Sequence, residues 1–206
     1  MYAQATGKLL AAAPHEDSQA IRKAYSAALA RGRMGRLWSS LTGRSCALFS
    51  LQDASQAFTV QARSSAGRRS VAIAQIRGSE GRAADFDRDF NPLQDHTQPR
   101  WLGIASAVQR GRNLPPVVLI QVNDLYFVRD GHHRISVARA LGRHTVEATI
   151  EVWQVSVPPS GQQLAHARKR EGPRRPAGGA GAGSLLRWIS GGLRPADGAG
   201  ACPAGS

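Results

Sequence analysis

Five consecutive residues, Asp130-Gly131-His132-His133-Arg134, carry side chains suited to chemistry on a phosphate group. The surrounding pattern predicts a strand that ends at Asp130 and a helix that begins directly after Gly131. A glycine at such a turn lets the backbone approach a ligand closely, and the first amides of a helix have no acceptor within the helix. With the helix dipole and the adjacent cationic groups, Gly131, His132, His133 and Arg134 are expected to bind a phosphate or sulfate.

The same residues also allow two other interpretations. Asp130 could cap the helix, Arg134 could pair with Asp130 or Glu147, and one histidine could simply be buried and hydrogen-bonded. Cationic groups at the amino end of a helix oppose its dipole, however, and this cost to stability favours a functional site. If the chain is an enzyme, His132, His133 and Asp130 are the candidates for acid–base or Mg²⁺-orienting groups.

Hydrophobic patterning predicts the elements that position the turn. Residues 117–122 and 125–129 are typical of two buried strands joined by a tight reversal, and residues 132–141 are typical of a helix that ends at Gly142. Residues 145–152 alternate between apolar and polar, which indicates a half-buried strand. Upstream, we expect a strand at 71–76 and a helix over 101–110.

The stretch from residue 115 to 155 resembles the core of ParB/sulfiredoxin-like domains, because it has their order of strand, hairpin, glycine turn, helix and strand. With the upstream block GSEGRAADFDRDF at residues 78–90, the resemblance covers about residues 71–157 and extends to uncharacterised bacterial ParB-like proteins. It implies an α+β fold of ParB/sulfiredoxin-like type, a small mixed sheet with short helices. Charge and composition place a basic helical arm before this domain and a disordered tail after it.

The resemblance also implies a ligand. In ParB-type proteins the matching turn is Gly-Glu-Arg-Arg and binds the triphosphate of a cytidine nucleotide, and in sulfiredoxins it is Gly-Cys-His-Arg and serves ATP-dependent repair of an oxidised cysteine. Gly131, His133 and Arg134 match these motifs, but His132 occupies the position of the catalytic cysteine, so no sulfiredoxin activity is expected. The helix-turn-helix domain that normally follows in ParB proteins is not expected here, because residues 158–206 cannot supply it.

The expected function is therefore a nucleotide- or phosphate-binding module, with CTP or ATP and Mg²⁺ as the candidate ligands. A phosphotransferase or nuclease of the same fold is one alternative. A degenerate domain that serves protein interaction is the other.

Charge suggests a second, polyanionic partner. The chain has 27 Lys and Arg against 14 Asp and Glu. Ser18 is expected to cap a basic helix that Gly32 and Gly35 weaken and that Gly43 ends. This region could bind DNA phosphates without sequence preference or lie on an anionic membrane surface, and a solvated basic face is the plain alternative. The expected DNA contacts are Arg22, Lys23, Arg31, Arg33, Arg36 and Arg44.

Composition divides the chain into four parts. We expect a loose terminus at 1–17, the basic helical arm at 18–70, the ParB/sulfiredoxin-like domain at 71–157 and a Gly/Pro/Arg-rich disordered tail at 158–206.

Cys46 and Cys202 are isolated, which indicates neither a disulfide framework nor a zinc cluster. The spacing of Asp85, Asp87 and Asp89 fails the pattern of a calcium loop, so no metal site is predicted. No transmembrane segment or secretory signal is recognised, and a cytoplasmic location is expected.

Overall fold

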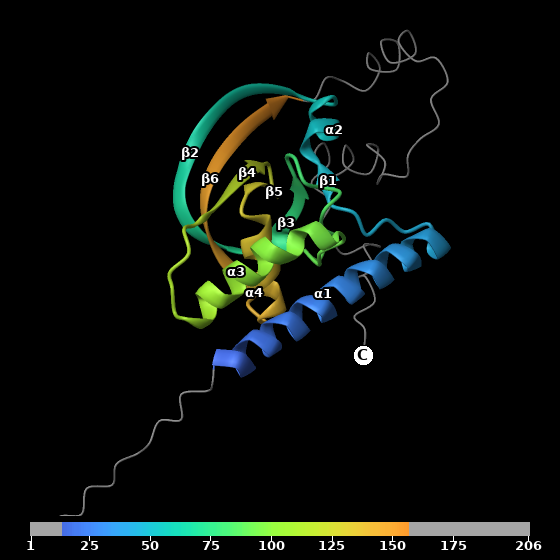
Figure 1. Ribbon diagram of the computed structural model, residues 1–206. Coiled ribbons are helices and arrows are strands. Elements are labelled where there is room, and N and C mark those ends of the chain that lie inside the picture. The colour runs from blue at the N-terminus through green and yellow to red at the C-terminus, as the bar shows by residue number, and fades with distance from the viewer. Residues whose placement is uncertain (1–13, 157–206) are drawn as a thin grey trace, which may run out of the picture.

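The computed structural model describes residues 14–156, which form one mixed α/β fold around a six-stranded sheet (Figure 1). Some of the sequence predictions concern residues 1–13 and 157–206, including the expected tail and Cys202. These residues lie outside the described part of the structure. The helices are α1 (Pro14–Thr42), α2 (Leu51–Ser55), α3 (Gln98–Gln109) and α4 (His132–Ala140). The strands are β1 (Phe49–Ser50), β2 (Thr59–Ala72), β3 (Ile76–Ser79), β4 (Val117–Val122), β5 (Leu125–Asp130) and β6 (Thr145–Ser156).

The centre of the sheet has the elements predicted from sequence. The strand order is β1-β3-β5-β4-β6-β2. Strands β4 and β5 form the expected antiparallel hairpin, and β6 lies parallel to β4 on its other side. Strand β3 runs parallel to β5, so Ser79 and Asp130, at their carboxyl ends, lie at the same edge of the sheet. This arrangement brings the segment after β3 next to the Gly131 turn.

Strand β2 differs from the sequence analysis, which placed residues 18–70 in a helical arm and the first core strand at 71–76. Residues 59–72 instead pair with β6 along its whole length, and the short strand within the core is β3. All side chains from 61 to 70 are exposed, so no alternation of apolar residues marks this strand. Its stability comes from backbone pairing with a strand more than 70 residues away in sequence, which local patterning does not record.

The core lies on both faces of the sheet because the side chains of central strands alternate. Tyr126 and Val128 of β5 pack on one face with Ile135 of α4, whereas Leu125 and Phe127 pack on the opposite face, which α2 covers. Gly78 permits close packing of β3 on β5, since a Cβ there would lie 2.2 Å from the Phe127 ring.

Helices α3 and α4 run in the same direction over one face of the sheet. The indole of Trp101, in the first turn of α3, donates a hydrogen bond of 2.9 Å to Ser136 in the middle of α4, and near the ends of both helices Val108 and Leu141 line the same cleft. Helix α1 crosses them, with Tyr25 packed edge-on against Trp101 at a ring distance of 5.4 Å. The amino ends of α3 and α4 therefore lie at one side of the molecule and their carboxyl ends at the other.

Helix α1 is continuous through Gly32 and Gly35, which we expected to weaken it. Gly32 allows α1 to approach the loop before α3, because a Cβ on it would lie 2.4 Å from the carbonyl oxygen of Pro92. Gly35 has more room, because a Cβ on it would lie 3.7 Å from its nearest neighbour, Oδ2 of Asp87. The glycine at 32 is thus required by packing, and the one at 35 is not.

We expect Gly32→Ala to lower the free energy of unfolding by about 1–3 kcal/mol, since the methyl group meets a backbone carbonyl that has no free rotamer to move into. Gly35→Ala is the matched control. It should be neutral or stabilise by up to about 1 kcal/mol, because alanine favours the helix. Urea denaturation of both variants checks this, and equal stabilities would contradict the close approach at Gly32.

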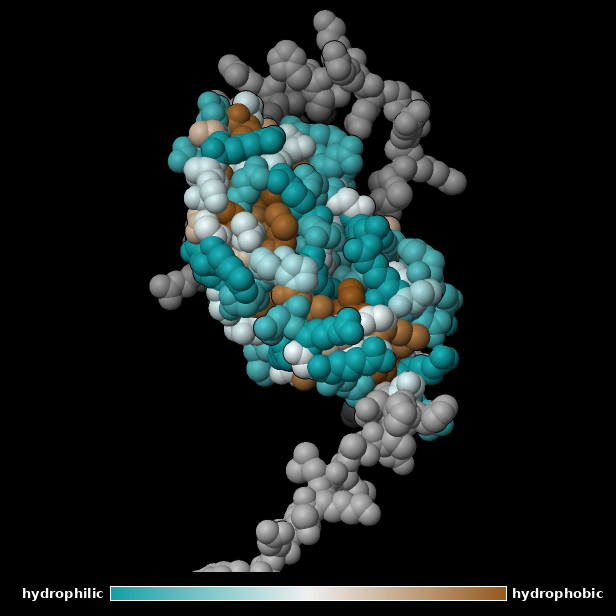
Figure 2. Space-filling view, turned by 60° about the vertical axis from the view of Figure 1, so that its left-hand side comes forward, coloured by the Kyte–Doolittle hydropathy of each residue, from teal (hydrophilic) through white to brown (hydrophobic). Residues whose placement is uncertain are grey.

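The described helices include none that is long and apolar enough to cross a membrane. Figure 2 shows one face of the molecule, on which hydrophilic residues predominate and apolar residues gather in separate patches.

Candidate functional site

The Gly131 turn connects β5 to α4 as predicted. Gly131 is the amino-terminal cap of α4 and has a left-handed backbone, with φ of 105°. A Cβ at this position would lie 2.6 Å from Cγ1 of Val117, so space as well as conformation requires glycine. No side chain caps the helix, so Asp130 does not have the capping role considered above. The first amides of α4 are therefore left without a side-chain acceptor.

Arg134 holds this turn in place. Its guanidinium donates to the backbone oxygens of Pro115 and Pro116, at 2.6 and 2.8 Å, and to the carboxylate of Asp130. Of the two ion pairs considered for Arg134, the structure therefore contains the one with Asp130. Three of its N–H groups are occupied by the protein, and its side chain is only 13% exposed. This geometry ties the first turn of α4 to the segment before β4.

His132 is fully packed beside the end of β3. Its ring is 4% exposed, stacks on Phe86 and lies 2.7 Å from Ser79 Oγ through Nε2. The same Ser79 oxygen accepts the backbone N–H of Arg82 at 2.8 Å. Burial lowers the pKa of His132 from 6.5 to about 4, so the ring is neutral at physiological pH.

His133 is buried without a hydrogen-bond partner. Its residue is 7% exposed, the ring packs edge-on against Phe86 at 5.2 Å, and it makes no hydrogen bond to any residue between 14 and 156. Among the described residues, Gln121 Oε1 is the one fully buried side-chain nitrogen or oxygen without a hydrogen-bond partner, so the ring nitrogens of His133 stay accessible and are available to a ligand. Burial, then the nearby charge of Arg100, lowers the pKa of His133 to about 4. Its ring is therefore a neutral donor and acceptor rather than a cation that titrates near pH 6.5.

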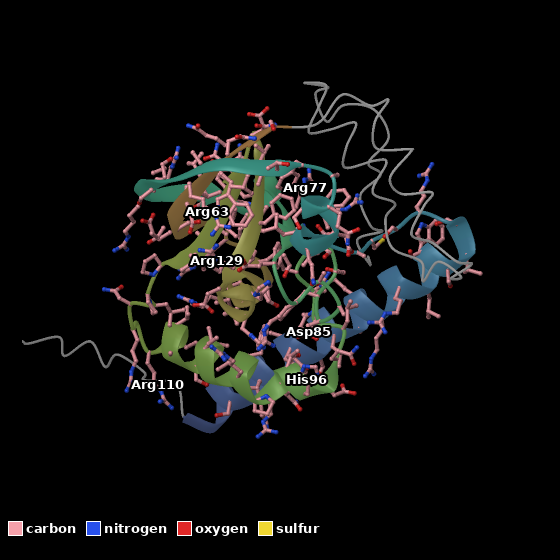
Figure 3. The ribbon with its side chains drawn as sticks, turned by 90° about the horizontal axis from the view of Figure 1, so that it is seen from above. Arg63, Arg77, Asp85, His96, Arg110 and Arg129 are labelled. Atoms are coloured by element: carbon pink, nitrogen blue, oxygen red, sulfur yellow. The ribbon has the colours of Figure 1, made fainter. Side chains whose placement is uncertain are left out.

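Two arginines surround the histidines. Arg82 and Arg100 both lower the pKa of His133 by their charge, and Asp85 and His96 lie close enough to affect it as well. Arg82 donates to Asp85 at 3.1 Å, and His96 lies 3.7 Å from the same carboxylate. Figure 3 shows Asp85 and His96 beside each other near the start of α3, with Arg110 at the other end of that helix.

Two aligned helix dipoles act on this region. Arg100 lies in the first turn of α3 and His133 in the first turn of α4, and the two helices run in the same direction. The partial positive charge at each helix start adds to the charges of Arg82 and Arg100. The site is therefore suited to an anion, and Asp85 is its one opposing carboxylate among the groups that act on His133.

A cleft of about 1130 Å³ lies at the opposite ends of α3 and α4. Arg112 and Arg143 border it, but both helices end there with their carbonyl groups, which produce a negative potential. The two arginines offset this potential, and Arg68 at the edge of the cleft is paired with Glu147 at 3.4 Å. The amino ends of α3 and α4 are therefore the better candidate for an anion, while Arg134 of the Gly131 turn also lines this cleft.

The structure brings together only part of the predicted catalytic set. His132 and His133 pack around Phe86, whereas the carboxylate of Asp130 is bonded to Arg134. An imidazole with a pKa near 4 is a weak base at neutral pH. In residues 14–156, no three His, Cys, Asp or Glu side chains are grouped so that they could hold a metal ion.

Sequence reasoning did not place Ser79, Arg82, Phe86 or Arg100 in the candidate site. Three of them lie within or beside the block at 78–90 that carried part of the resemblance. The resemblance of that block was therefore the sequence signal that could have identified them, and Ser79 in it ends strand β3. Arg100 is brought in only by the packing of α3 on α4.

The expected DNA contacts lie on and after α1. The side chains of Arg22, Lys23, Arg31, Arg33, Arg36 and Arg44 are all exposed. Arg33 is paired with Asp95 at 2.8 Å, and Arg31 donates to Asn91 at 3.4 Å. These two arginines attach α1 to the loop before α3.

No protein-family model matches the chain, and no curated protein matches it. A crystal structure of sulfiredoxin from Arabidopsis thaliana matches with 17% sequence identity and a TM-score of 0.31. This match covers 50% of the present chain and 98% of the sulfiredoxin chain. A similarity of this size does not assign the chain to a family.

Proposed function

We propose that this chain is a phosphate-binding module of the ParB/sulfiredoxin-like type, whose ligand places a phosphate group against the amino end of α4. The observation that carries the proposal is His133, a largely buried imidazole whose ring nitrogens are accessible and have no hydrogen-bond partner among the described residues, directly beside uncapped helix amides. A phosphate oxygen supplies the missing acceptor for both kinds of donor.

Each group has a distinct part in this proposal. The amides at the start of α4 and a neutral His133 ring donate hydrogen bonds to phosphate oxygens. Arg82 and Arg100 supply the charge, because both are exposed on the side of His133. Arg134 orients the turn through Pro115, Pro116 and Asp130 rather than acting as the main charge.

The nature of the ligand follows from the resemblance of Gly131, His133 and Arg134 to the turns of nucleotide-binding relatives. It makes CTP or ATP with Mg²⁺ the first ligands to test. Pyrophosphate is the minimal probe, because it contains the group that the helix start is expected to bind and lacks the base and sugar.

The double substitution Arg82→Ala/Arg100→Ala should weaken binding of pyrophosphate, CTP or ATP by about 10- to 100-fold, because each arginine contributes a charge-assisted hydrogen bond. Isothermal titration calorimetry with and without Mg²⁺ measures this effect. Arg110→Ala is the matched control, since it removes the same charge at the other end of α3 (Figure 3) and should leave affinity unchanged. Absence of heat with all three ligands, or equal affinity in the double variant, would refute the proposal.

A further inference from the structure

The carboxyl-terminal turns of α1 present four large apolar side chains to solvent. Met34, Leu37, Trp38 and Leu41 are 57%, 65%, 48% and 81% exposed. Their spacing of three, four and seven residues places them on one face of the helix. Single exposed apolar residues are common on protein surfaces, but four adjacent ones form a patch that marks an interaction site.

This patch faces away from the rest of the fold. The buried side of α1 consists of Ile21, Tyr25, Ala28, Gly32 and Gly35. At about 3.6 residues per turn, the apolar four lie nearly opposite that side. Figure 1 shows the carboxyl end of α1 extending beyond the sheet and the other helices, so a broad partner could reach it.

Arginines border the patch. Helical geometry places Arg31 on one border of the apolar face and Arg33, which is paired with Asp95, on the other, and both are exposed. Arg44, one residue beyond Gly43, is exposed as well. The described residues of this helix from 18 onward contain no acidic side chain.

The combination of arginines and apolar side chains distinguishes three possible partners: a second copy of this chain, DNA and an anionic lipid surface. A second copy would bring the same arginines against one another, which opposes association through this face. DNA would match the arginines but would leave the four apolar side chains unused. An anionic lipid surface matches both, because arginines attract its headgroups and Trp and Leu insert at the boundary between headgroups and acyl chains.

We propose that the carboxyl-terminal end of α1 docks on an anionic lipid surface through Met34, Leu37, Trp38 and Leu41, with Arg31, Arg33 and Arg44 on the headgroups. This binding is peripheral and reversible, since it uses two helical turns. It is independent of the phosphate site, which lies at the starts of α3 and α4.

Co-sedimentation of the full chain with vesicles tests the proposal. The wild type should bind vesicles of phosphatidylcholine with phosphatidylglycerol, bind pure phosphatidylcholine vesicles much less, and lose binding as NaCl rises. Leu37→Ser/Leu41→Ser should lower the partition coefficient by at least about tenfold, because two apolar side chains no longer gain from leaving water. Ala27→Ser/Ala30→Ser, on the same face but earlier in the helix, is the matched control and should bind as wild type does.

Three outcomes would overturn the inference. The first is no co-sedimentation of the wild type with phosphatidylglycerol vesicles. The second is equal binding by Leu37→Ser/Leu41→Ser, which would leave only non-specific electrostatic attraction, as to DNA. The third is a dimer by light scattering in the wild type that becomes a monomer in this variant, without vesicle binding, because a second copy would then cover the patch. Near-ultraviolet circular dichroism confirms that the variants fold.

Discussion

Lowering the pH from 6.5 to 4 should reduce the free energy of unfolding by several kcal/mol, because His132 and His133 are buried as neutral imidazoles. Burial lowers the pKa of each from 6.5 to about 4. Below pH 6.5 the unfolded chain binds protons that the folded chain does not, so stability falls until the pH reaches the folded pKa. Each histidine contributes up to about 3 kcal/mol to this loss. Well above pH 6.5, neither histidine makes the free energy of unfolding depend on pH.

Charged groups around the two histidines also shift the pKa values of their rings. Arg82 acts on both rings in the same sense as burial, and Arg100 does so on His133, whereas Asp85 opposes it. The contribution of Asp87 to stability changes with pH in the opposite direction to that of the histidines. Burial raises the pKa of its carboxyl, so its contribution makes the fold less stable as the pH rises above 3.8. The two histidines have the larger effect across the window from 6.5 to 4.

Urea denaturation at a series of pH values measures this dependence. His133→Phe should remove about half of the acid-induced loss, since the ring keeps its contact with Phe86 but no longer titrates. His144→Gln, at an exposed position, should leave the pH profile unchanged. A profile in His133→Phe that is as steep as in the wild type would show that His133 is not the group that binds the extra proton on unfolding.

Gly131→Ala should lower the free energy of unfolding by about 3 kcal/mol and abolish phosphate binding. The backbone at Gly131 has a φ of 105°, which costs an alanine about 1 kcal/mol or more. The new Cβ would also lie 2.6 Å from Cγ1 and 2.9 Å from Cβ of Val117, a buried residue of β4. Relief of this overlap must shift either the strand or the start of α4, and costs a further 1–3 kcal/mol or so.

Gly142→Ala separates the two contributions to this effect. Gly142 also has a left-handed backbone, with φ of 74°, but a Cβ there would have nothing within 4 Å. We expect it to cost about 1 kcal/mol and to leave ligand affinity intact. Thermal denaturation and calorimetric titration of both variants measure stability and binding. Equal costs at 131 and 142 would show that Val117 does not confine the turn.

Local patterning was sufficient for the central elements of the sheet. Strands β4, β5 and β6 and helices α3 and α4 were predicted near their observed positions, because apolar residues recur in them at the period of the element they form. The Gly131 turn was also predicted, since a glycine between a strand and a helix has a clear local meaning. These features depend on residues that are neighbours in sequence.

Tertiary structure alone decided the rest, because it depends on pairs that are distant in sequence. Strand β2 has no apolar pattern and exists through pairing with β6. Arg134, which we expected to bind phosphate together with Gly131, His132 and His133, is bonded to Pro115, Pro116 and Asp130. The histidines, which the sequence analysis counted among the cationic groups, are neutral at physiological pH because residues of β3, the loop after it and α3 enclose them. The sequence determined by itself where the backbone turns, whereas burial and charge at that turn depend on contacts formed only in the folded chain.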